Sequence, residues 1–430
     1  MILRDAVHGL VSFEADEERV IPQLIDTPEV QRLRRIRQLG VASYAFPGGE
    51  HTRFAHAIGT SHVMKLLISR LRQIHGELPF WQQVTSDRAQ DALAAALLHD
   101  VGHGPLSHLF EDAILGTKHH EDWTEKIIVD PSTSVHQKLA SIDSHMPERV
   151  AALIRGEHPL PYLARAVSGT LDVDRCDYLL RDAHATGVRY GNFDLDWLFR
   201  SLRFAPALDG QAPGLAIDGA KGLPAIEAFI LGRLSMFQQV YLHKATRSAE
   251  WMIRTVLKRV SSLIASGVRL VGTPRAIVHA AHGEPPLLAD YLELDDAVLT
   301  VAMHAWASGP DADLANLSMR VRERQLFKTF ELFGEQALAE GRAKALEMAR
   351  KVARDRGMNP DVFVGLDVAS DTPFGDGLGE SLLVVFSKGP ARQLRDVSFL
   401  LGRLAGQEIS RVRIIFSPEL REDITRVLGS

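Results

Sequence analysis

The sequence predicts a mainly α fold, with a large helical core followed by a small C-terminal α+β unit. Apolar residues recur at helical spacing over most of the chain, and the pattern changes to short β-rich runs after Gly357. A chain of 430 residues exceeds what one hydrophobic core usually supports. We therefore expect two parts, residues 1–335 and residues 336–430.

The composition is that of an ordinary soluble globular protein, with 46% hydrophobic and 24% charged residues. The formal net charge of −5 argues against nucleic acid as a partner, since nucleic-acid-binding surfaces are usually basic. Cys176 is the only cysteine, which excludes a disulfide framework or a thiolate metal site within one chain. The first residues lack the apolar core of a signal peptide, and no apolar run approaches the roughly 20 residues that span a bilayer. We expect a cytoplasmic protein with no membrane partner.

The N-terminal segment, residues 1–13, contains His8-Gly9 and is expected to form a short strand or hairpin. A helix start follows at Asp26-Thr27-Pro28-Glu29, with Asp26 as the capping side chain and proline in the first turn. The helix that follows carries several arginines among apolar residues. They form either a solvated face or a surface for anions or another subunit: Arg32, Arg34, Arg35 and Arg37.

Two further helices carry residues suited to phosphate chemistry. A helix that opens near His51 places Arg53 and His56 on one face, three residues apart. Such an arginine can neutralise a phosphate while the histidine holds an ion. A second helix covers residues 92–98, and Gly102, Gly104 and Pro105 end it.

Three histidines and an aspartate are therefore presented where a buried helix opens into a loop: His99, Asp100, His103 and His108. An adjacent histidine and aspartate offer one nitrogen and one anionic oxygen, a donor set that suits divalent transition metals. Histidines are also concentrated early in the chain, with 13 of 18 in the first 160 residues. A single histidine is more often a core or surface residue, but this density indicates a metal or proton-transfer site.

On a helix over residues 170–182, Asp174, then Asp177 or Tyr178, then Arg181 or Asp182 line up at intervals of three and four residues. Such a stripe either is solvated or faces a cleft, and the leucines mixed into it favour a cleft. An acid from this helix is therefore a candidate metal ligand beside the earlier histidines and aspartate.

The remaining elements are predicted from periodicity and from glycine and proline breaks. We expect a helix start at residues 118–122, helices with short breaks over 124–168, a small hairpin within 203–223, a helix, continuous or broken, over 225–265, a helical segment at 286–307, a loop at 308–313 and a long helix or helix pair over 320–356. In the C-terminal unit we expect strands at 361–368, 381–387 and 411–417 and a helix at 390–405.

Several runs together resemble the HD superfamily of metal-dependent phosphohydrolases. Within it they resemble the branch of HD-domain deoxynucleoside triphosphate triphosphohydrolases, which includes the SAM-and-HD-domain protein of animals. The matching runs are Ile25-Asp26-Thr27-Pro28, Gln31-Arg32-Leu33-Arg34, Gln38-Leu39-Gly40, Phe46-Pro47-Gly48, Arg53-Phe54-Ala55-His56, His99-Asp100-Val101-Gly102-His103-Gly104-Pro105-Leu106-Ser107-His108 and Asp172-Val173-Asp174-Arg175. The resemblance continues through residues 241–244 and, more faintly, to about residue 333.

The resemblance implies an HD-domain helical core and a set of site residues. It implies metal ligation by His56, His99, Asp100 and Asp174, proton transfer assisted by His103 and His120, and a phosphate contact by His108. Four residues match phosphate-binding positions of the family: Arg53, Arg175, Arg233 and Lys244. Four match positions around the sugar: Gln38, Leu39, Tyr178 and Asp182. Tyr241 and His243 match positions near the substrate.

Two imidazoles and two carboxylates suit a divalent transition metal, Mn, Fe, Co, Ni or Zn, and the site allows an additional Mg ion. The partners that the resemblance implies are a nucleotide substrate and further copies of the chain, as a dimer or tetramer. In activated members of the branch, the helix at residues 26–34 helps to bind an activating nucleotide. A basic residue that such members place before the first strand is missing here, so we expect activity without a guanine-nucleotide activator.

The implied reaction converts a (deoxy)nucleoside triphosphate to nucleoside and triphosphate by attack of metal-activated water at the α-phosphorus. Ala55, Arg175 and Cys176 differ from the residues that are common at their positions. Hydrolysis of dinucleoside polyphosphates, alarmones or another phosphorylated nucleotide therefore stays open. A non-catalytic nucleotide-sensing or nucleic-acid-binding module with a vestigial metal site is a third hypothesis, against which the complete ligand set argues.

Overall fold

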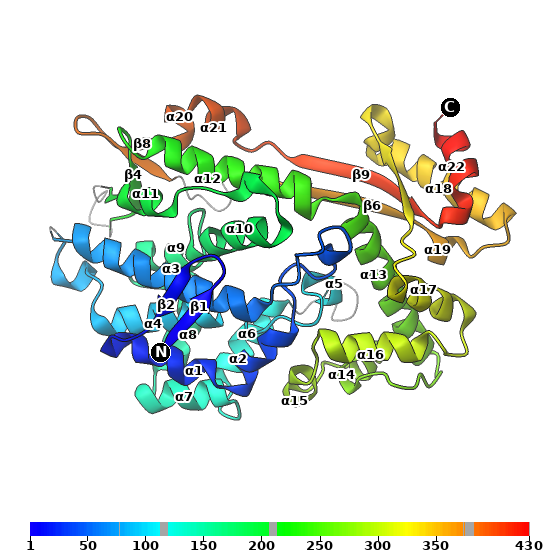
Figure 1. Ribbon diagram of the computed structural model, residues 1–430, viewed down its shortest axis with the longest axis horizontal. Helices are drawn as coiled ribbons and strands as arrows, with labels where there is room; N and C mark the ends of the chain where they lie inside the picture. Colours follow the sequence, from blue (N-terminus) through cyan, green and yellow to red (C-terminus); the bar gives the residue numbers. More distant parts are fainter. Residues whose placement is uncertain (77, 112–118, 206–212, 373, 375–381, 430) are drawn as a thin grey trace.

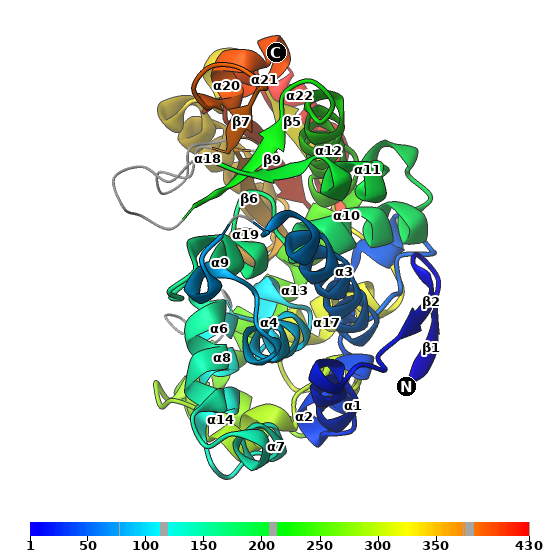
Figure 2. The same ribbon diagram turned by 90° about the vertical axis from the view of Figure 1, so that its left-hand side faces the viewer.

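The computed structural model describes the chain except for residues 77, 112–118, 206–212, 373, 375–381 and 430. The architecture is mainly helical, with strands near the N-terminus and again from residue 202 onwards (Figures 1 and 2). The predicted mainly α fold is confirmed. One large apolar core runs through the helical part and includes Leu401 and Ile415 near the C-terminus.

The N-terminal hairpin pairs β1 (Ile2–Asp5) with β2 (Gly9–Ser12) in antiparallel register, as predicted. Two short helices follow, α1 (Val20–Ile25) and α2 (Pro28–Arg32). The prediction of Asp26 as the helix cap was wrong, because Asp26 ends α1 and Thr27 is the N-cap of α2. Pro28 at the first helical position holds Thr27 in an extended conformation, with ψ of 144°.

Three long helices form the centre of the helical part: α3 (Arg53–Ile74), α4 (Ser86–Leu98) and α10 (Val173–Thr186). Each begins with a side-chain cap, in which Thr52, Thr85 or Asp172 accepts a hydrogen bond from a backbone N–H of the first turn. Helix α4 is buried at every residue from 91 to 98. It ends at Leu98, as the sequence indicated, and the segment that follows stays buried from Asp100 to Ser107.

Shorter helices surround this centre. They are α5 (His108–Phe110), α6 (His120–Val129), α7 (Ser134–Ile142), α8 (Met146–Ile154) and α9 (Pro161–Val167). The predicted breaks near residues 130 and 158 lie between α6 and α7 and between α8 and α9. None of the helices in the described part of the chain is both long and apolar enough to cross a bilayer.

After α11 (Leu195–Arg200), β3 (Leu202–Phe204) and β4 (Leu215–Asp218) form the predicted antiparallel hairpin. The helix predicted over residues 225–265 is broken by a π-helical turn, Phe237–Tyr241. Helices α12 (Leu223–Met236) and α13 (Lys244–Ala265) flank this turn. Further helices near α13 are α14 (Arg275–Ala281), α15 (Leu288–Leu292), α16 (Asp296–Trp306) and α17 (Ala312–Arg322).

The long helix or helix pair predicted over residues 320–356 was wrong. Helix α17 ends at Arg322, and β5 (Lys328–Leu332) precedes α18 (Ala339–Asp355). Arg324, with a left-handed φ of 55°, redirects the chain between α17 and β5. Strand β5 is stabilised by antiparallel pairing with β9 (Ile409–Phe416), a distant partner that the local periodicity cannot reveal.

Two sheets join segments from both sides of the expected boundary at residue 335. In one, β5 and β6 (Val364–Asp371) flank β9, and in the other the strand order is β3, β4, β7 (Leu383–Val385) and β8 (Arg392–Gln393). Short helices complete this region: α19 (Pro360–Phe363), α20 (Leu394–Val397), α21 (Phe399–Leu404) and α22 (Arg421–Leu428). The division into residues 1–335 and 336–430 stays a prediction.

Leu97→Ala in α4 should lower the free energy of unfolding by about 2–5 kcal/mol, because the Leu97 side chain is fully buried and its loss leaves a cavity. The same substitution at Leu400 in α21, which is 46% exposed, should change it by less than about 0.5 kcal/mol. Equilibrium denaturation measures both values. Equal effects of the two substitutions would contradict the central position of α4.

Candidate metal centre and active site

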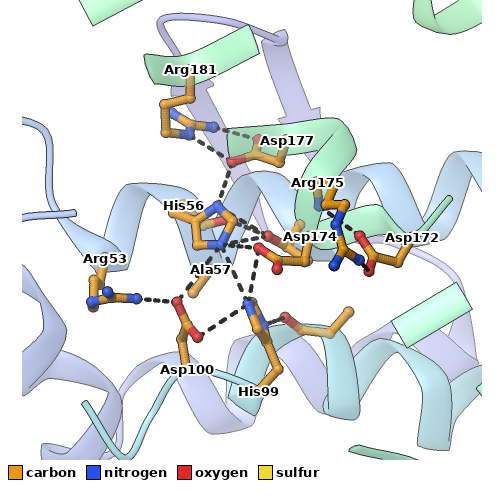
Figure 3. Close-up of polar contacts among 12 residues, drawn as sticks. Arg53, His56, Ala57, His99, Asp100, Asp172, Asp174, Arg175, Asp177 and Arg181 are labelled. Atoms are coloured by element: carbon orange, nitrogen blue, oxygen red, sulfur yellow. Dashed lines mark hydrogen bonds and ion pairs between the residues drawn. The ribbon is translucent and has the colours of Figure 1, made fainter. Parts of the chain in front are cut away.

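Side chains from three separate segments meet where α3, α4 and α10 approach one another (Figure 3). His56 comes from α3, His99 follows the last residue of α4, and Asp174 lies in the first turn of α10. His56 Nε2 lies 3.0 Å from Asp174 Oδ1 and 3.3 Å from His99 Nε2. His99 Nε2 lies 3.5 Å from Asp174 Oδ1. Three of the four expected metal ligands therefore face one point.

These separations fit a divalent transition metal. Ligand atoms about 2.1 Å from an ion lie about 3.0 Å apart in octahedral geometry and about 3.4 Å apart in tetrahedral geometry. The two imidazoles are also oriented for binding. His99 Nδ1 donates to the Ala96 carbonyl at 2.9 Å and His56 Nδ1 donates to Asp177 at 2.7 Å, which leaves both Nε2 atoms for a metal ion.

Asp100 lies beside this group and bonds to Arg53. Its Oδ1 is 3.5 Å from His99 Nε2, its Oδ2 is 3.8 Å from His56 Nε2, and Oδ2 accepts a hydrogen bond from Arg53. Burial would raise the pKa of Asp100, but the nearby His99 and Arg53 hold it well below its usual range. Asp100 is thus an anion within 3.8 Å of the candidate ligands His99 and His56.

A second group of acidic and basic side chains lies on the other side of Asp100. Asp100 Oδ1 is 3.3 Å from His103 Nε2, and the His103 ring stacks on the His120 ring with 3.8 Å between centroids. Glu111 bridges the two rings, with 3.3 Å from Oε1 to His103 Nδ1 and from Oε2 to His120 Nδ1. Burial and the charge of Arg53 lower the pKa of His103 to about 4, so this ring is neutral at pH 7. The atoms of Asp100, His103 and His120 also lie close enough to hold an ion.

Asp177 is a fully buried carboxylate that stands behind His56 on α10 (Figure 3). Burial would raise the pKa of Asp177, but Arg181 and the hydrogen bonds from His56 and His8 hold it well below its usual range. Burial would lower the pKa of His56, yet its hydrogen bonds to Asp174 and Asp177 raise it to about 10. At pH 7, without a metal ion, His56 therefore carries a proton on both ring nitrogens.

A cavity of about 620 Å³ adjoins this cluster. Arg53 and Ser107, which bond to each other, are part of its wall, and Tyr241 donates to Asp182 within it at 2.7 Å. Six of the ten residues that we expected to bind substrate line this cavity: Gln38, Leu39, Arg53, Tyr178, Asp182 and Tyr241.

The other four expected substrate residues do not line the cavity. Arg175 pairs with Asp172, and Arg233 lies 3.6 Å from Asp371 of β6. His243 accepts a hydrogen bond from the backbone at the start of α13, and Lys244 lines a separate cavity of about 440 Å³. Their contacts with substrate stay predictions, and the side chain of His108 lies outside the described residues.

Two residues of this site were not assigned a role from the sequence. Asp177 had a detectable signal, because it lies on the charged stripe of the predicted helix, three residues after Asp174 and four before Arg181. Glu111 had none, because its partners His103 and His120 lie eight and nine residues away along the chain.

Residues 53–182, which include all four candidate ligands, match the HD domain family. The chain is 32% identical to the uncharacterized protein YwfO of Bacillus subtilis, over 99% of this chain and 94% of that protein. It is 33% identical to the deoxynucleoside triphosphate triphosphohydrolase SAMHD1 homolog of Dictyostelium discoideum over 59% of this chain, and it spans about half, 48%, of that protein's length. Among solved structures, a phosphohydrolase from Bacteroides thetaiotaomicron is similar with a TM-score of 0.81 and 27% identity, covering 97% of this chain and 99% of that one.

The raised pKa of His56 predicts that metal affinity depends on pH. A metal ion must replace the Nε2 proton. Between pH 6 and pH 8, each proton that the metal displaces should therefore raise the apparent metal affinity by about tenfold per pH unit. The affinity falls at low pH because protons then compete for the same nitrogen. Titration of the chelator-treated protein with Co²⁺ at several pH values measures this. An affinity that stays constant over this range would contradict the proton on His56.

Proposed function

The chain belongs to the HD-domain superfamily of metal-dependent phosphohydrolases, and from this membership we propose that it hydrolyses deoxynucleoside triphosphates. The reaction adds water at the α-phosphorus and releases the nucleoside and inorganic triphosphate. The position of the large cavity carries the proposal. Its wall contains Arg53, which bonds to the candidate metal ligand Asp100. It also contains Asp182, which accepts a hydrogen bond from Tyr241. The deoxynucleoside triphosphate triphosphohydrolase named among the relatives supports the substrate class.

The candidate ligands His56, His99, Asp100 and Asp174 would hold a divalent ion, which when bound supplies a Lewis acid and lowers the pKa of water. The guanidinium of Arg53 is directed towards the same place from α3. It would stabilise negative charge on the phosphate chain once the carboxylate of Asp100 turns to the metal.

His120 is the candidate proton donor to the leaving 5′ oxygen of the nucleoside. Its Nδ1 faces Glu111 and its Nε2 faces Glu121, each at 3.3 Å, and the two carboxylates orient the ring. Glu121 is 67% exposed, so its side chain would turn into solvent and yield Nε2 to the substrate. His103 stacks on it and is neutral at pH 7, so it does not repel the protonated form of His120. General acid catalysis of this kind typically contributes about 10²–10⁴-fold to the rate.

Polar groups in the cavity suit a sugar. Asp182 receives hydrogen bonds from Tyr241 and His51, each at 2.7 Å, which fixes its carboxylate. Gln38 Oε1 is buried and, among the described residues, has no hydrogen-bond partner. It would accept a hydrogen bond from a sugar hydroxyl.

A second substrate class is favoured by the residues that line the far part of the cavity. Beyond Tyr241 the wall continues along α13 to Arg247, Glu250 and Arg254 and reaches β6. This extra polar space would admit a second nucleoside or further phosphates, so a dinucleoside polyphosphate or an alarmone is the alternative substrate.

The products distinguish the proposed reaction from other phosphate hydrolyses. With dATP, dGTP, dCTP or dTTP and a divalent metal, ³¹P NMR should show inorganic triphosphate as the phosphate product, because attack at the α-phosphorus releases the phosphate chain intact. A parallel panel with ribonucleotides and dinucleoside polyphosphates tests the alternative. Orthophosphate or pyrophosphate as the only product would contradict the proposal.

Asp174→Asn should lower kcat by more than about 100-fold, because loss of a group that only orients a ligand already costs about 10–100-fold. Steady-state turnover and metal content of the variant measure the effect. Asp196→Asn in α11, at an exposed position, is the matched control and should keep the wild-type rate. Equal activity of both variants would mean that Asp174 is not a ligand.

A further inference from the structure

The N-terminal hairpin reaches the metal centre through a buried chain of hydrogen bonds. We propose that His8, in the turn between β1 and β2, is a positioning residue for the candidate metal ligand His56 and acts through Asp177. The inference rests on the proposal that His56 binds the metal ion, and it does not depend on which nucleotide is hydrolysed.

The carboxylate of Asp177 is fully occupied by four hydrogen-bond donors. Oδ1 accepts from His8 Nε2 at 2.6 Å and from Arg181 Nη2 at 2.9 Å, and Oδ2 accepts from His56 Nδ1 at 2.7 Å and from Arg181 Nε at 2.8 Å. An ionised carboxylate offers about four acceptor positions, so none remains free. Since Asp177 is completely buried, each donor contributes to its orientation without competition from solvent.

The hairpin turn places His8 accurately. Asp5 Oδ1 accepts hydrogen bonds from the backbone N–H groups of Val7 and His8, each at 2.9 Å, which closes the turn. Gly9 completes it with a left-handed φ of 72°, a conformation that favours glycine. Asp5 Oδ2 also accepts from Arg181 Nη1 at 2.9 Å. The hairpin therefore contacts both Asp177 and the arginine that binds it (Figure 2 shows the hairpin beside the helical part).

Helix α3 leaves space for this arrangement. Gly59 follows His56 by three residues, and a Cβ at Gly59 would lie 2.0 Å from Asp177 Oδ1 and 2.2 Å from Arg181 Nη2. Any side chain here would displace the Asp177–Arg181 pair from His56. A glycine inside a helix costs about 1 kcal/mol relative to alanine, and the close approach of this pair gives a physical reason for it.

The hydrogen bonds from His8 through Asp177 determine how the His56 ring is oriented. Asp177 fixes the His56 ring by accepting from Nδ1, and the ring then directs Nε2 towards Asp174 and His99. Without His8, Asp177 Oδ1 loses one of its two donors in a buried site, and the orientation of the carboxylate then depends on Arg181 and His56 alone. Partners that orient a metal ligand in this way typically contribute about 10–100-fold to metal affinity.

Two substitutions of His8 separate the hydrogen bond from the size of the side chain. In His8→Gln the amide nitrogen occupies the position of Nε2 and keeps the bond to Asp177, whereas in His8→Asn the nitrogen reaches only the position of Nδ1. Titration of the chelator-treated full chain with Co²⁺ should show an affinity about 10–100-fold weaker in His8→Asn and within about threefold of wild type in His8→Gln. Gly59→Ala should weaken the affinity in the same direction.

His62→Asn is the matched control, because the His62 ring lies 5.3 Å from the His8 ring without a hydrogen bond to Asp177. It should keep the wild-type Co²⁺ affinity. The activity lost by His8→Asn at limiting metal should return at saturating metal, which a general folding defect would not do.

Wild-type Co²⁺ affinity in His8→Asn would overturn the role of His8 but not the metal centre. A loss of affinity in His8→Gln equal to that in His8→Asn would have the same meaning. A wild-type chain that binds no Co²⁺ would instead overturn the metal centre and this inference together.

Discussion

The site depends on one electrostatic constraint, which is that the charges buried between α3, α4 and α10 must neutralise one another. Acidic and basic groups alternate through the cluster, since Arg53 faces Asp100, His56 lies between Asp174 and Asp177, and Arg181 lies between Asp177 and Asp5. A buried charge without a partner is strongly destabilising, so each pair restricts where its two elements lie. The same ion pairs that allow these helices to pack together thus also bring the candidate ligands to one point.

Much of this centre could be predicted from the sequence because short segments of the chain carry the relevant residues. A buried helix that ends at His99 and Asp100, a helix face with Arg53 and His56, and an acidic stripe that contains Asp174 are all visible in short segments. The structure brings these segments together, and Arg53 of one segment donates a hydrogen bond to Asp100 of another. The HD domain match covers the same residues.

What the sequence did not predict depends on partners that are distant along the chain. Strand β5 lies in a stretch with helical character, and only its pairing with β9 makes it a strand. Glu111 contacts two histidines on different elements, and His8 of the first hairpin bonds to Asp177, 169 residues away. Arg175 was placed towards phosphate, but a carboxylate one turn earlier on the same helix, Asp172, binds its guanidinium in this structure.

The strand pairing across residue 335 affects how the protein is made. Strand β4 has β7 as its parallel neighbour, and β5 has β9, so both early strands leave the ribosome before their partners have been synthesised. Pairing over such long stretches of chain is slow compared with helix formation. During that interval the nascent chain presents unpaired strand edges, which are templates for association with other chains. Pairing with β7 and β9 therefore also covers edges of β4 and β5 that are exposed in the nascent chain.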